Sequence, residues 1–424
     1  MKILLITTPN EAQAIDYTTP SFYCRATQPV IRYMPLGILS VAAGVSDNHE
    51  IEILDAASLD LSINETINKI KTINPDVLGI SSWTRKVYPM AEILRRVEGP
   101  IKVVGGPHVT HYAKETMALG ADAVFKHDAD HNFSTWLDEG CKSGIYGDYI
   151  ENIDSLPFPK RELLNMKDYR VKEKDANNTL FKTAGLRPPM ISSKGCPFRC
   201  IFCDVQEKKF RWFSPERVVD EMEHLLSYGA TSIHILDDCF NVKNDRVLEI
   251  CAEINRRKLK FNWSARGRVN IDDETARALV ESGCNKLHVG VESLDPDVLR
   301  WMNKGINVKT TQNFFEICKK FGIETLGYFI LGSPMETREY RKRLPEMVRK
   351  LGVTYPYFNI LYPAANTKYY QMLREDGTFE RDYWQDFAEN PTPNFEMPLP
   401  RTPELQAELQ QTVHKYLEIV YGTS

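Results

Sequence analysis

Residues 195–203 read Gly-Cys-Pro-Phe-Arg-Cys-Ile-Phe-Cys and place three cysteines in a C-x3-C-x2-C pattern. The pattern comes directly after a predicted strand, so the three side chains belong to one loop. Thiolates hold iron–sulfur clusters, and three of them leave one iron of a [4Fe-4S] cluster without a protein ligand. An open coordination position is where a metal can do chemistry. The sequence therefore predicts a metal cluster bound by Cys196, Cys200 and Cys203.

Three other readings of the cysteine pattern are a zinc site, a disulfide and buried structural thiols. A structural zinc site needs a fourth ligand, and the next candidates, His224 and Cys239, lack close ligand spacing. Most of the remaining cysteines are expected to be small buried hydrophobic residues. They are Cys24, Cys141, Cys239, Cys251, Cys284 and Cys318.

The cysteine loop belongs to a series of alternating strands and helices that starts at Met190. Six such repeats predict a partial (β/α)6 barrel, about three-quarters of a (β/α)8 barrel, with its chemistry at the C-terminal strand ends. The predicted strands are 190–192, 232–236, 262–266, 286–290, 324–331 and 355–361. The predicted helices are 215–228, 246–257, 273–281, 296–302, 308–321 and 339–351.

The first 140 residues show a similar alternation, with predicted strands at 2–6, 50–54, 77–81, 102–104 and, last, 123–125. Strands with helices between them indicate a doubly wound, Rossmann-like parallel sheet of the α/β class. Ligands of such sheets bind beyond the C-terminal strand ends, where the strand order reverses. The residues in those loops are Thr8, Pro9, Ser81, Ser82, Trp83, Thr84, Arg85, Gly105, Gly106, Pro107, His108 and Val109.

The predicted domain organisation has four parts. A sheet domain spans 1–145, a polar and proline-containing linker 146–188, the partial barrel 189–365 and a short C-terminal extension 366–424. The formal net charge of −4 gives no reason to expect a nucleic-acid surface. No apolar run is long enough to cross a bilayer, and the N-terminus lacks a signal-peptide pattern. We therefore expect a cytoplasmic protein without nucleic-acid or membrane partners.

The stretch 190–365 resembles the radical S-adenosylmethionine (SAM) superfamily in both the cysteine motif and its position after the first barrel strand. The resemblance implies a [4Fe-4S] cluster whose open iron is chelated by SAM. Electron transfer from an external donor then cleaves SAM to methionine and a 5′-deoxyadenosyl radical. Phe202 matches the family position beside the SAM adenine.

Later strand ends also resemble the SAM-binding positions of that superfamily. They imply SAM contacts by Asp237, Asp238, Ser264, Arg268, Glu292 and Ser293. Charged and polar groups there can pair with the zwitterionic methionine moiety, although an Asp or Ser after a strand is often only a helix cap. Arg266 competes with Arg268 for the same role.

Residues 1–140 resemble the cobalamin-binding domain that often precedes a radical SAM barrel. The resemblance rests on the Gly-Gly-Pro-His loop at 105–108, the loop at 77–84 and the helix start at 34–37. The D-x-H-x-x-G motif that supplies a histidine to cobalt is absent, because 47–52 reads Asp-Asn-His-Glu-Ile-Glu. The lower cobalt face is therefore expected to lie near Ser81, Trp83, Thr84 or Arg85.

Histidines of this N-terminal region allow two interpretations. His108 contacts the cofactor tail or is a surface-loop residue, whereas His111, His127 and His131 could mimic a metal site but are expected to be solvated. The segment 126–130, Lys-His-Asp-Ala-Asp, also departs from the Gly-Glu-rich run that the family commonly has.

Together the two resemblances imply a cobalamin-dependent radical SAM C-methyltransferase that methylates an unactivated carbon with methylcobalamin. In overall size the chain resembles protein-modifying methylases of methyl-coenzyme M reductase, including the glutamine Cα-methyltransferase, which implies a protein or peptide substrate. Non-methylating ring formation or rearrangement on a small molecule and a cobalamin sensor are the alternatives. Residues that could line the barrel mouth, or merely pack the barrel, are Tyr328, Tyr357, Asn359 and Tyr362.

Overall fold

The computed structural model describes residues 1–15, 33–172, 184–205 and 207–421, so Cys24 lies outside the described residues. The described chain forms two compact units. Unit 1 comprises 1–15, 33–168 and 374–398, and unit 2 comprises 169–172, 184–205, 207–373 and 399–421. None of the helices in these described ranges combines the length and apolarity needed to cross a membrane.

Unit 1 is built on a parallel sheet of six strands in the order β2-β1-β3-β4-β5-β6. The strand order reverses next to β1, which pairs with β2 on one side and β3 on the other, so the predicted doubly wound topology is confirmed. The strands are β1 Lys2–Thr7, β2 Glu50–Asp55, β3 Val77–Ser81, β4 Ile101–Gly105, β5 Ala123–Phe125 and β6 Gly144–Tyr146.

The prediction that Ala123–Phe125 is the last strand of this sheet was wrong. Gly144–Tyr146 pairs with β5 as a further parallel strand. This edge strand has only three residues, begins with a glycine and exposes Ile145. It therefore lacks the apolar run or alternation by which a strand is recognised in a sequence.

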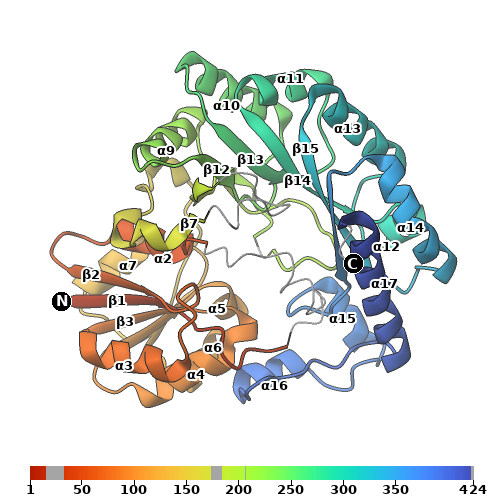
Figure 1. The fold of residues 1–424 in the computed structure, drawn as a ribbon. Coiled ribbons are helices and arrows are strands. Elements are labelled where there is room, and N and C mark those ends of the chain that lie inside the picture. The colour runs from red at the N-terminus through yellow and green to blue at the C-terminus, as the bar shows by residue number, and fades with distance from the viewer. Residues whose placement is uncertain (16–32, 173–183, 206, 422–424) are drawn as a thin grey trace. The chain divides into compact units, whose positions relative to one another are not determined.

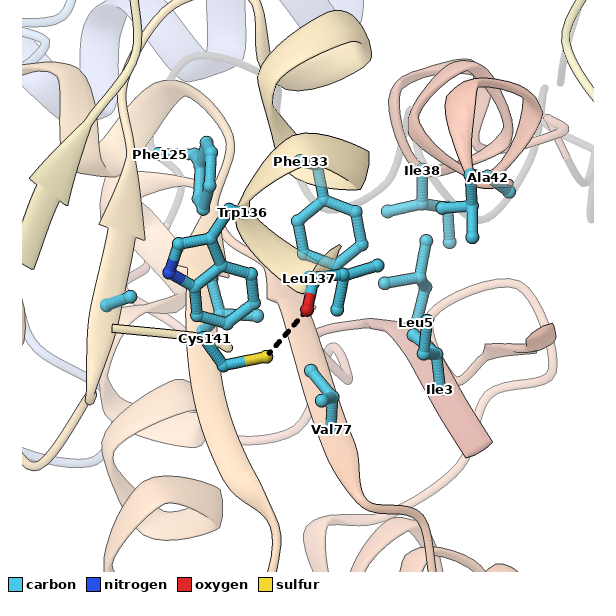
Figure 2. Packing of buried hydrophobic residues seen from close by; sticks show 13 residues of the cluster. Ile3, Leu5, Ile38, Ala42, Val77, Phe125, Phe133, Trp136, Leu137 and Cys141 are labelled. Carbon is cyan, nitrogen blue, oxygen red and sulfur yellow. Dashed lines mark hydrogen bonds between the residues drawn. The ribbon is translucent and has the colours of Figure 1, made fainter. Parts of the chain in front are cut away.

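The core of unit 1 on one side of the sheet lies beneath α2 Leu36–Gly44 and α7 Ala129–Asp138 (Figure 2). The ring of Phe125 packs edge-on against Phe133 and Trp136, with centroids 5.7 and 5.6 Å away. Helices α3 Ile63–Ile73 and α4 Val87–Arg96 lie on the opposite side of the sheet (Figure 1). With both faces covered, ligand access is left to the strand ends.

Unit 2 is built on a second parallel sheet of six strands, in the order β16-β15-β14-β13-β12-β9. Parallel strands with helical crossovers confirm the predicted partial (β/α)6 barrel (Figure 1). The strands are β9 Pro189–Met190, β12 Ser232–Ile235, β13 Asn262–Gly267, β14 Cys284–Glu292, β15 Glu324–Leu331 and β16 Tyr355–Ile360. The helices that follow them are α9 Pro215–Ser227, α10 Asn244–Arg256, α11 Asp273–Glu281, α12 Pro296–Trp301, α13 Val308–Phe321 and α14 Arg338–Leu351.

The segment predicted as a linker contains short regular elements. They are η2 Ile153–Ser155, η3 Arg161–Leu163, η4 Met166–Tyr169 and the antiparallel pair β7 Arg170–Val171 with β8 Gly185–Leu186. The C-terminal segment contributes to both units. Helix α16 Tyr383–Glu389 belongs to unit 1, where Gln385 Nε2 donates to Glu115 Oε1 at 2.7 Å. Helices α15 Lys368–Glu375 and α17 Pro403–Tyr421 lie largely in unit 2.

Candidate functional site

The cysteine loop leaves β10 Ser193–Lys194 and returns at β11 Arg211–Trp212, which pairs with β10 in antiparallel fashion. Backbone hydrogen bonds tie the loop to neighbouring elements: Ile201 N donates to Met302 O at 3.0 Å, and Tyr369 N donates to Ile201 O at 2.8 Å. Gly195 has a φ of +80°, and a Cβ there would lie 2.3 Å from Lys209 O. Only glycine therefore allows the loop to begin in this way.

Asp237 fixes the start of the same loop. Its carboxylate accepts hydrogen bonds from the backbone N–H groups of Ser192 and Ser193, at 2.6 and 3.1 Å, and from both hydroxyl groups, each at 2.6 Å. The carboxylate is thus occupied in ordering the residues before Cys196. Contact of Asp237 with SAM stays a prediction.

The three cysteines of the loop are partly exposed, and none of the eight described cysteines forms a disulfide. A hydrogen bond with Cys239 is the largest of the effects that lower the pKa of Cys196 to about 6. Burial raises the pKa of Cys203 to about 12. Within the described ranges, no three His, Cys, Asp or Glu side chains are grouped so that they could share one ion. In a [4Fe-4S] cluster each cysteine binds a different iron, so three thiols that hold a cluster do not have to meet at one ion, as zinc ligands do.

The two candidates for a fourth zinc ligand lie in different surroundings. His224 belongs to α9 and packs against Tyr228, with ring centroids 4.8 Å apart. Cys239 is buried beside Cys196, and this neighbour is the largest of the causes that raise the pKa of its thiol.

Arg268 lies against the cysteine loop. Its guanidinium carbon is 3.8 Å from the ring centroid of Phe198, and its Nη1 donates to Cys200 Sγ at 3.8 Å. Its Nη2 donates to the backbone carbonyl of Lys304. This arrangement places a positive charge beside a cysteine predicted to bind the cluster.

Glu292 occupies a bulge at the C-terminal end of β14 with a φ of +64°, which is uncommon for a residue other than glycine. Its Oε1 lies 2.6 Å from Lys304 Nζ, and both side chains are buried. Lys304 Nζ is in turn 5.9 Å from the ring centroid of Phe202. A Cβ at Gly290 would lie 2.3 Å from Glu292 Oε1, so the ion pair depends on that glycine.

The other residues predicted to bind SAM lie in separate places. Ser264 Oγ hydrogen-bonds His234 Nδ1 at 2.7 Å, and Ser293 Oγ hydrogen-bonds Tyr340 Oη at 2.9 Å. Asp238 has an exposed side chain, yet desolvation by surrounding protein, followed by the charges of Asp237 and Asp204, raises its pKa to about 6. SAM contacts by these residues stay predictions.

Four residues were predicted to line the barrel mouth. Tyr328 and Tyr357 are paired on β15 and β16, with their rings edge-to-face at 5.6 Å. Asn359 lies two residues further along β16, and Tyr362 is buried just beyond that strand. Their contact with substrate stays a prediction.

In unit 1, hydrogen bonds between neighbouring loops join the ends of β1, β3 and β4. Thr8 Oγ1 donates to Ser81 O at 2.8 Å, Ser82 N donates to Gly105 O at 3.1 Å, and His108 N donates to Ser82 O at 3.2 Å. Gly106 has a φ of +96°, and a Cβ there would lie 2.8 Å from Ser82 O. The predicted loops thus form one edge, at which Pro9, Pro107 and Val109 are also placed, and Trp83 is 56% exposed.

His108 is fully buried, so its interpretation as a surface-loop residue was wrong. Its Nδ1 lies 3.4 Å from Thr84 Oγ1, its ring stacks on Tyr112, and burial lowers its pKa to about 3. Its Nε2 has no hydrogen-bond partner among the described residues. Buried polar atoms are normally satisfied, and a corrin with amide side chains at this edge would supply the missing partner.

Lys86 also belongs to this edge and was not predicted from the sequence. Its Nζ donates to Thr8 O at 3.2 Å, and burial lowers its pKa to about 8. Beside it, Arg85 Nη2 donates to Ala14 O at 3.1 Å. The available signal was a second cationic residue directly after Arg85, the last predicted residue of that loop.

The other histidines of unit 1 have local partners. His49 lies in the turn between α2 and β2, with its Nε2 3.0 Å from Asp138 Oδ1. His127 stacks on Tyr149 with ring centroids 4.2 Å apart, and His111 packs edge-on against Tyr112. His111 and His131 are exposed.

Comparison with known protein families finds one matching family for each of the two regions that contain a parallel sheet. Residues 190–348 match the radical SAM superfamily, and residues 30–135 match the B12 binding domain. An uncharacterized methyltransferase of Pyrococcus horikoshii is 31% identical over 92% of this chain and 86% of its own length. The bacteriochlorophyllide d C-8(2)-methyltransferase of Chlorobaculum tepidum is 26% identical, over 85% of this chain and 80% of its own.

A solved structure has a similar fold. The radical SAM methyltransferase TsrM from Kitasatospora setae, with cobalamin and a [4Fe-4S] cluster bound, superposes with a TM-score of 0.69 at 17% identity. The match covers 99% of this chain and 88% of that one. The families that match this chain use a [4Fe-4S] cluster, SAM and cobalamin, and radical SAM enzymes generally need an external electron donor. The chain therefore belongs to the cobalamin-dependent radical SAM C-methyltransferases.

Proposed function

We propose that this chain methylates an unactivated carbon and that this carbon is Cα of a glutamine in a protein substrate. The observation that supports methylation of an unactivated carbon is the loop with three cysteines, in which Arg268 donates a hydrogen bond to Cys200. The same chain also has a buried His108, at the loops beyond the sheet of unit 1, whose Nε2 is unsatisfied among the described residues. The Chlorobaculum tepidum relative is named as a C-8(2)-methyltransferase, and this supports transfer of a methyl group to a carbon atom. The glutamine assignment is supported by the similar size of protein-modifying methylases.

The described side chains would have distinct tasks in such a reaction. When bound, cluster and SAM supply a carbon-centred radical, and cobalamin supplies the methyl group. Cys196, Cys200 and Cys203 would hold the cluster, while Arg268 and the Lys304–Glu292 pair would maintain the charge balance around it. His108 and the glycines of its loop would hold the corrin periphery.

The test uses the full chain, reconstituted anaerobically with cluster and cobalamin, SAM labelled in its methyl group, and a glutamine-containing peptide. Label at the glutamine Cα, located by fragment mass spectrometry, is the expected result, and Cys200→Ala should abolish it. Label at another atom would refute the glutamine assignment alone. Substrate conversion without label in the product would refute methyl transfer itself.

A further inference from the structure

Arg266 projects from the face of the barrel sheet that the helices do not cover. Side chains alternate along a strand, and in β13 Trp263 and Ala265 are buried, with Trp263 Nε1 donating to Ser282 O at the end of α11 at 3.0 Å. Ser264 and Arg266 therefore face inward. The Arg266 side chain is exposed, although its strand lies in the middle of the sheet.

Two histidines flank Arg266 on the neighbouring strands. His288 of β14 is paired directly with Arg266, and His234 of β12 is paired with Ser264. The two imidazole rings are 4.6 Å apart, between centroids. His288 Nδ1 also lies 3.4 Å from Tyr328 Oη, so one polar row crosses β12 to β15.

The charges along this row are not balanced. In the part of the chain that the structure describes, the Arg266 guanidinium has no hydrogen bond or ion pair with a protein group. Other cations near the histidines do have partners: Arg187 Nε donates to Ser232 Oγ at 2.8 Å, and Lys286 Nζ lies 3.3 Å from Glu324 Oε2. Burial first, and the neighbouring cations second, lower the pKa of His234 to about 3. Burial and His234 likewise lower the pKa of His288 well below its usual range.

A cation without a counter-charge beside neutral imidazoles is suited to a carboxylate. The planar guanidinium binds a carboxylate through two parallel hydrogen bonds, and each neutral imidazole retains one N–H donor. The edge-to-face pair of Tyr328 and Tyr357 offers an aromatic surface next to these donors.

We propose that Arg266 binds a carboxylate of the substrate, with His234 and His288 as flanking hydrogen-bonding groups and Tyr328 beside them. This inference rests on the proposed function, because it assigns the substrate side of that reaction to the inner face of the barrel. The carboxylate can belong to a free small acid or to an acidic side chain near the methylated residue of a peptide.

The test measures binding to the full reconstituted chain, saturated with SAM, by isothermal titration. The probes are benzoate, its neutral analogue benzamide, and N-acetylglutamate α-amide as a peptide-like carboxylate. Arg266→Gln should weaken the binding of at least one carboxylate roughly 10- to 100-fold and leave benzamide unchanged. Tighter binding of benzoate indicates a free acid, and tighter binding of the glutamate derivative indicates a peptide.

Two further variants keep the outcome interpretable. Arg256→Gln removes an exposed guanidinium paired with Glu253 on α10 and should not change benzoate binding. Arg266→Glu should reverse the preference for an anionic ligand and bind the cation benzamidine more tightly than wild type does. A misfolded protein would not show this gain of binding. The proposal is overturned if neither carboxylate binds, or if Arg266→Gln binds both as wild type does.

A third outcome concerns SAM. Loss of the SAM-induced change in the cluster's electron paramagnetic resonance spectrum in Arg266→Gln would mean that the guanidinium serves SAM, and would also overturn the proposal. Failure of the labelled methyl transfer with intact carboxylate binding would instead count against the proposed function alone.

Discussion

Lys304 Nζ lies 2.6 Å from Glu292 Oε1, and each side chain is only 7% exposed. Removing one partner of a buried ion pair leaves an uncompensated charge, at a cost of about 3–5 kcal/mol. Lys304→Met should therefore lower the free energy of unfolding by about that amount. Urea denaturation of the variant and the wild type measures the difference.

The matched control for this prediction is Lys320→Met. Lys320 forms an ion pair with Asp273 on the protein surface, and exposed pairs contribute about 0–1 kcal/mol. The double variant Glu292→Gln/Lys304→Met should recover part of the lost stability, because no charge is left buried. Equal losses for Lys304→Met and Lys320→Met would contradict the account of the pair.

Each cysteine of the loop should be required for cluster binding. Cys196→Ala, Cys200→Ala and Cys203→Ala are expected to lose the visible absorption of the [4Fe-4S] cluster after anaerobic reconstitution. Cys251→Ala, which removes a thiol buried in α10, should keep its iron.

Cys239→Ala distinguishes a cluster from a zinc site. Cys239 is the buried thiol beside Cys196, and it should be dispensable for iron binding if three ligands suffice. Loss of metal from Cys239→Ala but not from Cys203→Ala, measured by metal analysis, would contradict the assigned ligand set.

Gly106→Ala should weaken cobalamin binding. The new Cβ would lie 2.8 Å from Ser82 O at a φ of +96°, so the loop must shift away from the end of β3. Titration of the apoprotein with hydroxocobalamin, followed by its visible spectrum, measures the affinity. Gly120→Ala is the control, since its φ is +106° but no atom lies within 4 Å of the added Cβ. Both variants bear backbone strain of about 1–3 kcal/mol, and only the first should lose affinity.

The buried Lys86 should make stability rise with pH. Its pKa is lowered to about 8 in the folded state, so between pH 8 and the unfolded pKa the unfolded chain binds more protons. Stability therefore increases with pH across that window. Urea denaturation at pH 7.5, 8.5 and 9.5 should show that the free energy of unfolding rises more steeply with pH in the wild type than in Lys86→Met. Parallel pH curves would exclude this contribution.

Both sheets were predictable because their strands and helices show clear hydrophobic periods. β13 was predicted as Asn262–Arg266 and observed as Asn262–Gly267. The cysteine motif was equally visible, since it is local in sequence. Strand β6 was missed because an exposed three-residue edge strand carries no such period.

The surroundings of individual side chains were not predictable, because they depend on contacts between distant elements. Arg266 and Arg268 lie two residues apart, and only the course of β13 and the loop after it decides that Arg268 reaches Cys200. The pairing of Glu292 with Lys304 depends on a bulge in β14. The burial of His108 depends on the loop after β3.

The four hydrogen bonds of Asp237 bear on how the protein acquires its cluster. They require no metal, because every donor belongs to Ser192 or Ser193. The conformational entropy of the residues before Cys196 is therefore lost when the barrel folds. We therefore expect iron and sulfide to bind to a loop that is already anchored at its beginning, so that cluster assembly follows the folding of the barrel.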